Sequence, residues 1–479
     1  MLFNSLAFAV FLPIVFIVYW AILPKYRWAL MLAASYYFYM CWNPKYVVLI
    51  LFTTVISYVA AILLEKQALK RNKRIIMLAT AVLCLGVLFF FKYFNFVSET
   101  VASILNIISI KMHPFTIKLM LPVGISFYTF QTLSYVIDVY RGEIHAETHF
   151  GYYAAFVSFF PQLVAGPIER TSNLLPQIKA NHEFEYNQAT YGLKLMAWGF
   201  FKKIVIADTL SKYVSIVYDE PKRFSGFALV LATVFFSLQI YCDFSGYSDI
   251  AVGTAKLLGI NLSTNFKSPY FSQSVKEFWS RWHISLSTWF RDYIYIPLGG
   301  NRVGKLKHKY NLLLTFLLSG LWHGASWTFV VWGGIHGGMQ AIESVVVPKN
   351  KLKSTGLVWW LRVLCIFSFS TVAWVFFIAN SVGDAGYVLT HWFAGITTPV
   401  SYLKLGFTGL GIDKIDLLCL MPSLILLGVY DYCSLKKDVI VSISTKKEVV
   451  RWAIYIFFVI WMIIGIPTNN SSEFIYFQF

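Results

Sequence analysis

The sequence predicts an all-α protein that crosses a membrane many times. Hydrophobic residues make up 58% of the 479 positions and charged residues only 13%, whereas soluble domains carry roughly 25% charged residues. Apolar runs of a length suited to membrane helices recur along the whole chain. The net charge is +17, but the basic residues gather in short segments between apolar runs. That pattern is typical of cytoplasmic loops beside anionic lipid, and no nucleic-acid-binding motif accompanies it.

The apolar runs define the expected helices in chain order. They fall near 6–23, 28–42, 46–64, 75–91, 117–137, 150–166, 190–207, 226–242, 311–322, 326–341, 358–379, 415–430 and 452–466. Several runs are short or contain Pro or Gly, which suits re-entrant or half-spanning segments. We therefore expect about eleven transmembrane helices. The first run lacks a basic start and a small-residue cleavage site, so we interpret it as a retained span rather than a signal peptide.

Basic segments set the expected orientation. The segment EKQALKRNKR (65–74) is the clearest cytoplasmic signal, and counting back from it places the N-terminus outside. The basic residues between 436 and 451 mark another cytoplasmic loop, which places the C-terminus outside as well. NRVGKLKHKY (301–310) is also expected to be cytoplasmic. Without a long linker or an internal repeat, 1–479 is predicted to be one membrane domain, with a core region at 121–341 and C-terminal spans at 358–479.

The middle of the chain departs from the simple apolar pattern. Residues 276–300 read KEFWSRWHISLSTWFRDYIYIPLGG, with tryptophans and charged residues between apolar ones. We expect short helical pieces at the cytoplasmic interface, anchored there by tryptophans and arginines. The anchoring residues would be Trp279, Trp282, Trp289, Arg281 and Arg291.

This block and a second one downstream carry a family resemblance. FWSRWHISLSTWFRDYIYIPLGGNR, followed by LSGLWHGASWTFVVWGGIHG, resembles the membrane-bound O-acyltransferase (MBOAT) family. The likeness is closest to the branch of the bacterial alginate O-acetyltransferase membrane subunit (AlgI-like). Further segments agree with that branch, namely LPVGISFYTFQTLSYVIDVYRGE, FFPQLVAGPIER, YCDFSGYSDIAVGTAKLLGINL and the ending FIYFQF. The RWH and WHG tripeptides in this order are far more specific for the family than either tripeptide alone.

The resemblance carries expectations about fold and site. It implies an MBOAT fold, with re-entrant and interfacial helices around a central tunnel that receives the acyl donor from the cytoplasm. It implies a bacterial cytoplasmic (inner) membrane location and a separate extracytoplasmic, esterase-like partner. His323 of WHG matches the family's catalytic histidine, and His283 of RWH matches its second signature position.

Physical arguments agree with His323 as a catalytic base. If a helix continues from Tyr310 at the membrane edge, His323 lies thirteen residues further on, a depth of about 20 Å. A donor from one face and an acceptor from the other could meet there. Histidine has an unperturbed pKa near 6.5, which suits removal of a hydroxyl proton. Gly320 and Gly324 would let a substrate or a neighbouring backbone approach closely.

The remaining polar residues leave alternatives open. His283 could be a proton-transfer partner or a positioning group, and His336 is interpreted as a packing residue. Arg281 and Arg291 could attract the phosphates of the donor or lipid headgroups. Asp243 and Asp249, separated by Ser and Gly, suggest a helix break with an N-cap, although Asp243 could also contact substrate. Tentative substrate- or donor-binding residues also include Trp282, Trp322, Tyr128 and Gln131.

The leading hypothesis is an O-acyltransferase of the acetylating kind. It would take acetyl from a cytoplasmic thioester, acetyl-CoA or another acyl thioester, for O-acetylation of an extracytoplasmic polysaccharide of alginate, cellulose or peptidoglycan type. One alternative is D-alanyl transfer to teichoic acid from a carrier protein, and the C-terminal region beyond about residue 400 favours acetylation over it. A transporter or flippase is the rival from another class, but no helical repeat supports it. No metal-ligand spacing and no bound cofactor are expected.

Overall fold

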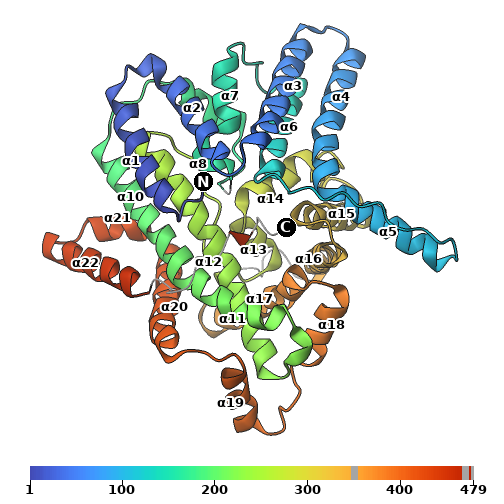
Figure 1. The fold of residues 1–479 in the computed structure, drawn as a ribbon, viewed down its shortest axis with the longest axis vertical. Helices are drawn as coiled ribbons and strands as arrows, with labels where there is room; N and C mark the ends of the chain where they lie inside the picture. The colour runs from blue at the N-terminus through green and yellow to red at the C-terminus, as the bar shows by residue number, and fades with distance from the viewer. Residues whose placement is uncertain (165, 347–353, 466–473, 476–479) are drawn as a thin grey trace. The chain divides into compact units, whose positions relative to one another are not determined.

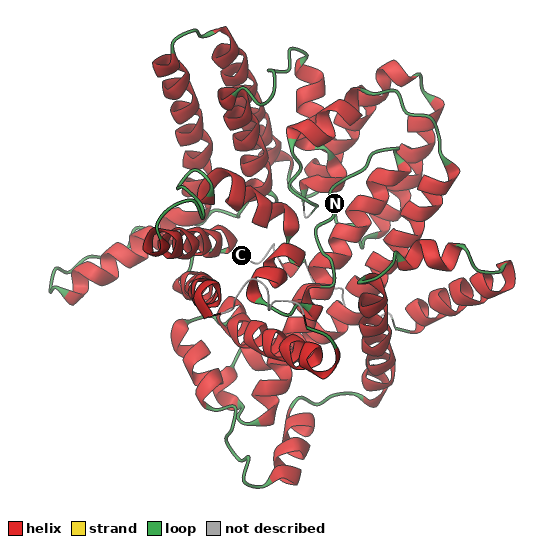
Figure 2. Cartoon of the chain, turned by 180° about the vertical axis from the view of Figure 1, so that it is seen from behind, coloured by secondary structure: helices red, strands yellow, loops and turns green. Residues whose placement is uncertain are grey.

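The computed structural model describes residues 1–164, 166–346, 354–465 and 474–475. Within these ranges the regular structure is helical and no strand is present (Figure 2). The α-helices are α1 Leu6–Ala21, α2 Arg27–Met40, α3 Val47–Lys66, α4 Lys70–Leu88, α5 Phe94–Ile107, α6 Ile125–Arg141, α7 Phe150–Ser158, α8 Phe160–Leu163, α9 Thr171–Lys179, α10 Tyr186–Phe200, α11 Asp208–Tyr218, α12 Phe227–Leu257, α13 Val275–Arg281, α14 Ile284–Phe290, α15 Lys305–His323, α16 Trp327–Val346, α17 Gly356–Ile378, α18 Val382–Thr390, α19 Pro399–Gly409, α20 Lys414–Ser434, α21 Val439–Ser444 and α22 Glu448–Ile464. Short 3₁₀ and π segments are η1 Pro24–Tyr26, η2 Pro44–Tyr46, η3 Phe89–Tyr93, η4 Phe201–Ala207, η5 Pro221–Arg223, η6 Pro269–Phe271 and η7 Arg291–Tyr295.

The expected all-α membrane class is confirmed. Every apolar run named above overlaps a described helix, and the block 276–300 forms the expected short pieces α13, α14 and η7. Among the described residues, five helical stretches are long and apolar enough to cross a membrane: Pro44–Lys66, Lys70–Ile107, Phe227–Leu257, Gly356–Ile378 and Lys414–Ser434. The shorter α1 is also apolar. The estimate of about eleven spans therefore stays a prediction, since several expected runs form shorter or more polar helices.

The chain divides into two compact units, and the expected single membrane domain stays a prediction. The first unit comprises Met1–Leu193 and Ala251–Ser263. In it α3 and α4 pack side by side against α6, and α7 packs against α2 and α3 (Figure 1). Buried apolar residues such as Phe8, Tyr19 and Phe38 fill the space among its N-terminal helices, because each of these helices is apolar on its inner face.

The second unit comprises Lys194–Ile250 and Thr264–Phe479. Its central pair is α15 and α16, which lie against each other, and α16 also contacts α17 and α13 (Figure 1). Glycines allow this close contact. A Cβ on Gly320 would lie 2.2 Å from the Phe329 carbonyl oxygen, and one on Gly333 would lie 2.3 Å from that of Phe316. The close approach expected at Gly320 is thus made by the backbone of α16.

The helix break expected between Asp243 and Asp249 is wrong, because α12 is continuous from Phe227 to Leu257. Two lysines of η4 explain why the acidic residues do not end the helix. Lys203 lies 2.8 Å from Asp243, and Lys202 lies 2.7 Å from Asp249. The carboxylates are therefore neutralised by ion pairs and do not need to cap a new helix start. Gly246 lets α12 approach this segment closely, since a Cβ there would lie 2.7 Å from the Gly199 carbonyl oxygen.

Candidate active site

His323 is the last residue of α15, which runs without interruption from Lys305. The segment between Tyr310 and His323 is therefore one continuous helix, as the depth argument assumed. The next residue, Gly324, ends the helix in extended backbone, and a Cβ on it would lie 2.0 Å from the Phe329 ring. The WHG tripeptide thus places His323 at a helix end that is held tightly against the start of α16.

Aromatic rings surround the His323 side chain. His323 is only 2% exposed, and its ring centroid lies 5.0 Å from Trp322, 5.1 Å from Trp332 and 5.2 Å from Phe377. All three neighbours meet it edge to face. These contacts hold the imidazole among rings of α15, α16 and α17.

His283 connects α13 to α14 and lies outside the helices long enough to cross a membrane. Its backbone has φ 42° and ψ 55°, the left-handed region that a residue with a side chain rarely adopts. The side chain is fully buried, with Nδ1 3.1 Å from Asn265 Oδ1 and the ring 4.6 Å from Phe244. Burial lowers the pKa of His283 to about 3, so its ring is neutral at physiological pH.

The two histidines of the RWH and WHG tripeptides are brought together in the second unit. Their ring centroids lie 6.5 Å apart with an interplanar angle of 59°. This separation is too long for a direct hydrogen bond between ring nitrogens. The two rings are therefore neighbours without a direct bond between them. Trp322 lies beside both rings, 5.9 Å from His283 by centroid.

His336 belongs to α16 and lies in a different environment. Trp279 Nε1 donates to His336 Nδ1 at 3.2 Å, and Phe278 stacks on the ring with an interplanar angle of 7°. Trp332 contacts both His336 and His323, at 4.9 and 5.1 Å between centroids. These contacts agree with the interpretation of His336 as a packing residue.

The tryptophans of the central block are buried, which corrects the expectation that they anchor the block at a membrane surface. Trp279, Trp282 and Trp289 are 6%, 0% and 5% exposed. Trp282 packs against Phe278, Phe266 and Trp374, with centroids 5.0 to 5.5 Å away. The alternation of aromatic and polar residues predicted a position at the membrane interface. The prediction was wrong for the tryptophans because sequence alone does not show which residues cover each ring. A donor-binding role for Trp282 stays a prediction.

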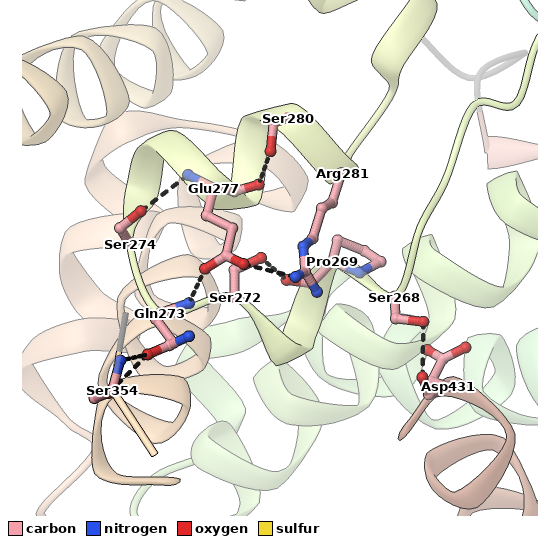
Figure 3. Close-up of polar contacts among 10 residues, drawn as sticks. All are labelled: Ser268, Pro269, Ser272, Gln273, Ser274, Glu277, Ser280, Arg281, Ser354 and Asp431. Atoms are coloured by element: carbon pink, nitrogen blue, oxygen red, sulfur yellow. Dashed lines mark hydrogen bonds and ion pairs between the residues drawn. The ribbon is translucent and has the colours of Figure 1, made fainter. Parts of the chain in front are cut away.

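Both arginines of the block have acidic partners. Arg281 Nη2 lies 2.6 Å from Glu277 Oε1, one helical turn earlier (Figure 3). Glu277 also accepts a hydrogen bond from the Gln273 backbone N–H, and its own N–H donates to Ser274, the N-cap of α13. Arg291 Nε lies 2.7 Å from Asp292 Oδ1. Phosphate binding by these arginines would compete with these pairs, so the donor-binding role stays a prediction.

Asp243 takes part in a buried ion cluster rather than standing alone. Lys203 bridges Asp243 and Asp208 at 2.8 Å each, and the three side chains are at most 3% exposed. Asp243 Oδ2 also accepts the backbone N–H of Ile475 at 2.8 Å. The neighbouring Phe474 is fully buried against Tyr247, 4.3 Å between centroids. This geometry favours a structural role for Asp243.

Tyr128 and Gln131 lie in α6 of the first unit, where both are buried. Gln131 Nε2 donates to the Phe156 carbonyl oxygen at 3.0 Å. Gly124 and Gly142, both with left-handed backbone, bound the helix that carries them. The substrate contacts tentatively assigned to them stay predictions.

Sequence reasoning missed three buried polar residues, of which Asn265 contacts His283 and the two lysines pair with carboxylates of α12. Asn265, Lys202 and Lys203 are buried residues of the second unit. The only signal for the lysines was their place in an apolar run, since a lysine there needs a partner. Asn265 gave no local signal, because its role depends on contacts with residues 18 to 20 positions later.

Together these observations define a helical membrane protein with a buried histidine pair among aromatic rings. The chain belongs to the membrane-bound O-acyltransferase (MBOAT) family, which matches residues 143–382. This segment includes both histidines of the pair. The family resemblance carried by the RWH and WHG segments is therefore confirmed, and with it the class of acyltransferase.

Three relatives illustrate the similarity. A probable alginate O-acetylase AlgI of Pseudomonas syringae pv. tomato is 40% identical over 391 residues, covering 81% of this chain and 74% of the relative. A peptidoglycan O-acetyltransferase of Helicobacter pylori is 35% identical over 421 residues, covering 81% and 79%. A teichoic acid D-alanyltransferase of Streptococcus thermophilus is 29% identical over 317 residues, covering 60% and 75%.

Proposed function

We propose that this O-acyltransferase takes an acetyl group from a cytoplasmic acyl thioester and delivers it across the membrane for O-acetylation of an extracytoplasmic polysaccharide. The observation that carries the proposal is the buried pair His283 and His323, with ring centroids 6.5 Å apart. Relatives named as a probable alginate O-acetylase and a peptidoglycan O-acetyltransferase, at 40% and 35% identity, support acetyl as the transferred group. The polymer is of the alginate, cellulose or peptidoglycan type.

His323 is the general base of the proposed reaction. An acceptor hydroxyl oxygen attacks the thioester carbonyl carbon, and its proton passes to the neutral imidazole. The resulting tetrahedral oxyanion collapses, the C–S bond breaks, and the thiolate leaves and takes up the proton. The aromatic enclosure of His323 supports this role because it excludes water that would otherwise hydrolyse the thioester.

The course of α15 supports a cytoplasmic donor. The residues around its N-terminal end, Arg302, Lys305 and Lys307, are exposed and basic. Its C-terminal end carries the buried His323, about 20 Å from Tyr310 by helical rise. Basic residues favour the cytoplasmic face and would attract the phosphates of acetyl-CoA or of a carrier protein's prosthetic group. The reacting carbonyl would then lie deep in the membrane.

The remaining parts of the proposal concern the destination of the acetyl group. The membrane is the bacterial cytoplasmic (inner) membrane, with both termini outside, as the basic segments indicate. The acetyl group is received there by a separate, extracytoplasmic esterase-like transferase, which makes transfer to the polysaccharide indirect. D-alanyl transfer is the second candidate, supported by the similarity to a teichoic acid D-alanyltransferase at 29% identity.

The experiment uses everted membrane vesicles from a strain that lacks the native gene and carries the full chain or a variant. Vesicles receive acetyl-CoA labelled in the acetyl group, and the release of free CoA thiol and the label bound to polymer are measured. The unsubstituted chain should consume acetyl-CoA, and His323→Ala should reduce consumption by about 10²- to 10⁴-fold. His336→Gln is the matched control, since it replaces another buried imidazole of the same unit.

Two outcomes would overturn the proposal. Undiminished acetyl-CoA consumption by His323→Ala, at equal amounts of inserted protein, would remove the base assignment. Transfer of D-alanine from a charged carrier protein with no turnover of acetyl-CoA would replace acetyl by the second candidate.

A further inference from the structure

Asn265 is a buried asparagine that contacts the start of α14 in two ways. Its backbone carbonyl oxygen accepts the Ile284 N–H at 2.9 Å. Its side-chain Oδ1 accepts the Ser285 N–H at 3.2 Å and the Ser285 hydroxyl at 3.0 Å. The first N–H groups of a helix have no partner inside the helix. Asn265 supplies partners for two of them, in place of the N-cap residue His283, whose side chain makes no capping bond.

The backbone N–H of Ser285 settles the orientation of the Asn265 amide. A backbone N–H can only donate, so the side-chain atom 3.2 Å from it must be the oxygen rather than the amide nitrogen. The amide nitrogen Nδ2 then points to Ser248 Oγ of α12, at 3.4 Å. The amide is therefore held from both ends and cannot rotate by half a turn without placing two donors against each other.

This orientation determines which nitrogen of His283 carries the proton. His283 Nδ1 lies 3.1 Å from the same Asn265 Oδ1. A carbonyl oxygen only accepts, so Nδ1 must be the donor. In a neutral imidazole the other nitrogen, Nε2, then has the lone pair.

We propose that Asn265 is a positioning residue that holds His283 with its proton on Nδ1, so that the Nε2 lone pair can accept a hydrogen bond from the acceptor hydroxyl and orient it while His323 takes its proton. The role of His283 in acyl transfer rests on the proposed function, whereas the position of its proton does not. Neutral His283 then has the role of a hydrogen-bond acceptor that orients the hydroxyl, and its Nε2 is excluded as a hydrogen-bond donor to the oxyanion.

The backbone around His283 supports a fixed ring. On one side Lys267 N–H donates to the Arg281 carbonyl oxygen at 3.0 Å, and on the other Ile284 N–H donates to Asn265. The segment from 265 to 267 therefore holds the chain before and after His283, which stabilises its left-handed backbone. Phe244 closes one side of the ring edge to face, at 4.6 Å. The geometry leaves the imidazole little freedom to turn and exchange its nitrogens.

Asn265→Asp and Asn265→Ala test the inference through the pH dependence of turnover. The ring neighbours of His283 include Phe244, Phe266, Trp322 and His323, of which His323 alone is titratable. The aspartate of Asn265→Asp still offers an oxygen to the Ser285 N–H and to His283 Nδ1–H. It also places a negative charge beside Nδ1, which favours the protonated form of His283. In this variant His283 should become protonated at about pH 4–6. The kcat should therefore fall on the acid side of the pH profile, with little change in KM for acetyl-CoA. Asn265→Ala should lower kcat roughly 10- to 100-fold at all pH values, because the ring loses its orientation.

The control is Asn311→Ala, which removes another buried asparagine of the second unit. Asn311 donates to the carbonyl oxygens of Leu298 and Gly300, so its loss should leave the pH profile unchanged. A pH profile of Asn265→Asp equal to that of the unsubstituted chain would overturn the inference and leave Asn265 as a helix cap alone. If His323→Ala also consumes acetyl-CoA normally, the proposed function fails instead.

A second readout does not depend on turnover. The ¹⁵N spectrum of the full chain labelled at histidine, in lipid nanodiscs, shows which nitrogen of each ring is protonated. The His283 signals are identified by their disappearance in His283→Gln. We expect them to report a proton on Nδ1 in the unsubstituted chain. A proton on Nε2 would contradict the inference even if the enzyme is an acetyltransferase.

Discussion

Replacing Lys203 by methionine tests whether the buried ion cluster, rather than substrate, accounts for Asp243. Lys203 Nζ lies 2.8 Å from both Asp208 and Asp243, and its side chain is 0% exposed. Methionine has nearly the same length but no charge. The substitution leaves two carboxylates buried without their cation, in a place where water cannot replace it.

The expected loss is large because both partners are buried. Removing one member of a buried ion pair costs about 3–5 kcal/mol, and Lys203 pairs with two buried carboxylates, one of which, Asp208, also accepts its hydrogen bond. We therefore expect the free energy of local unfolding around Lys203 to fall by about 3–5 kcal/mol. The matched control is Lys212→Met. Lys212 pairs with Asp416 at 3.0 Å, but its side chain is 47% exposed, so its loss should cost about 1 kcal/mol or less.

The assay uses Cys242, which precedes Asp243 in α12 and is 0% exposed. With the other five cysteines replaced, the rate at which a thiol reagent labels Cys242 reports opening of this part of the second unit. Lys203→Met should label roughly 10²- to 10⁴-fold faster. Labelling as slow as in Lys212→Met would refute the ion-cluster interpretation and would restore Asp243 as a candidate for substrate contact.

Two further predictions concern helix packing and pH. Gly320→Ala should lower the free energy of unfolding by about 1–3 kcal/mol in thermal unfolding, because its Cβ would lie 2.2 Å from the Phe329 oxygen. Gly338→Ala is the control and should cause no such loss, because a Cβ there would meet open space. Equal losses in the two variants would contradict the close contact at Gly320. Because burial lowers the pKa of His283 to about 3, only the unfolded chain takes up this proton below about pH 6.5. Stability present above pH 6.5 should therefore fall by about 2 kcal/mol by pH 5. His283→Gln should lose less over this interval, and an equal loss would refute the assignment.

The sequence predicted well what depends on local pattern. The apolar runs identified most of the longer helices, because a membrane helix must satisfy its backbone internally and show apolar side chains to lipid. The depth argument for His323 assumed a helix from Tyr310, and α15 is continuous over that segment. The RWH and WHG tripeptides predicted two histidines that the structure places 6.5 Å apart by centroid.

What could not be predicted depends on contacts between distant residues. Lys203 lies forty positions from Asp243, so nothing in the local sequence shows that these charges cancel and that α12 continues. The burial of Trp282 depends on rings from α13, α17 and the segment before η6. Asn265 is a polar residue in a connecting segment, and its contact with His283 exists only after the chain has folded.

The most direct test of the central claim is the acetyl-CoA consumption of His323→Ala in everted vesicles, compared with His336→Gln at equal inserted protein. We predict that His323→Ala loses about 10²- to 10⁴-fold in turnover, whereas His336→Gln keeps turnover per folded molecule. Comparable turnover in His323→Ala and the unsubstituted chain would contradict the assignment of His323 as the base.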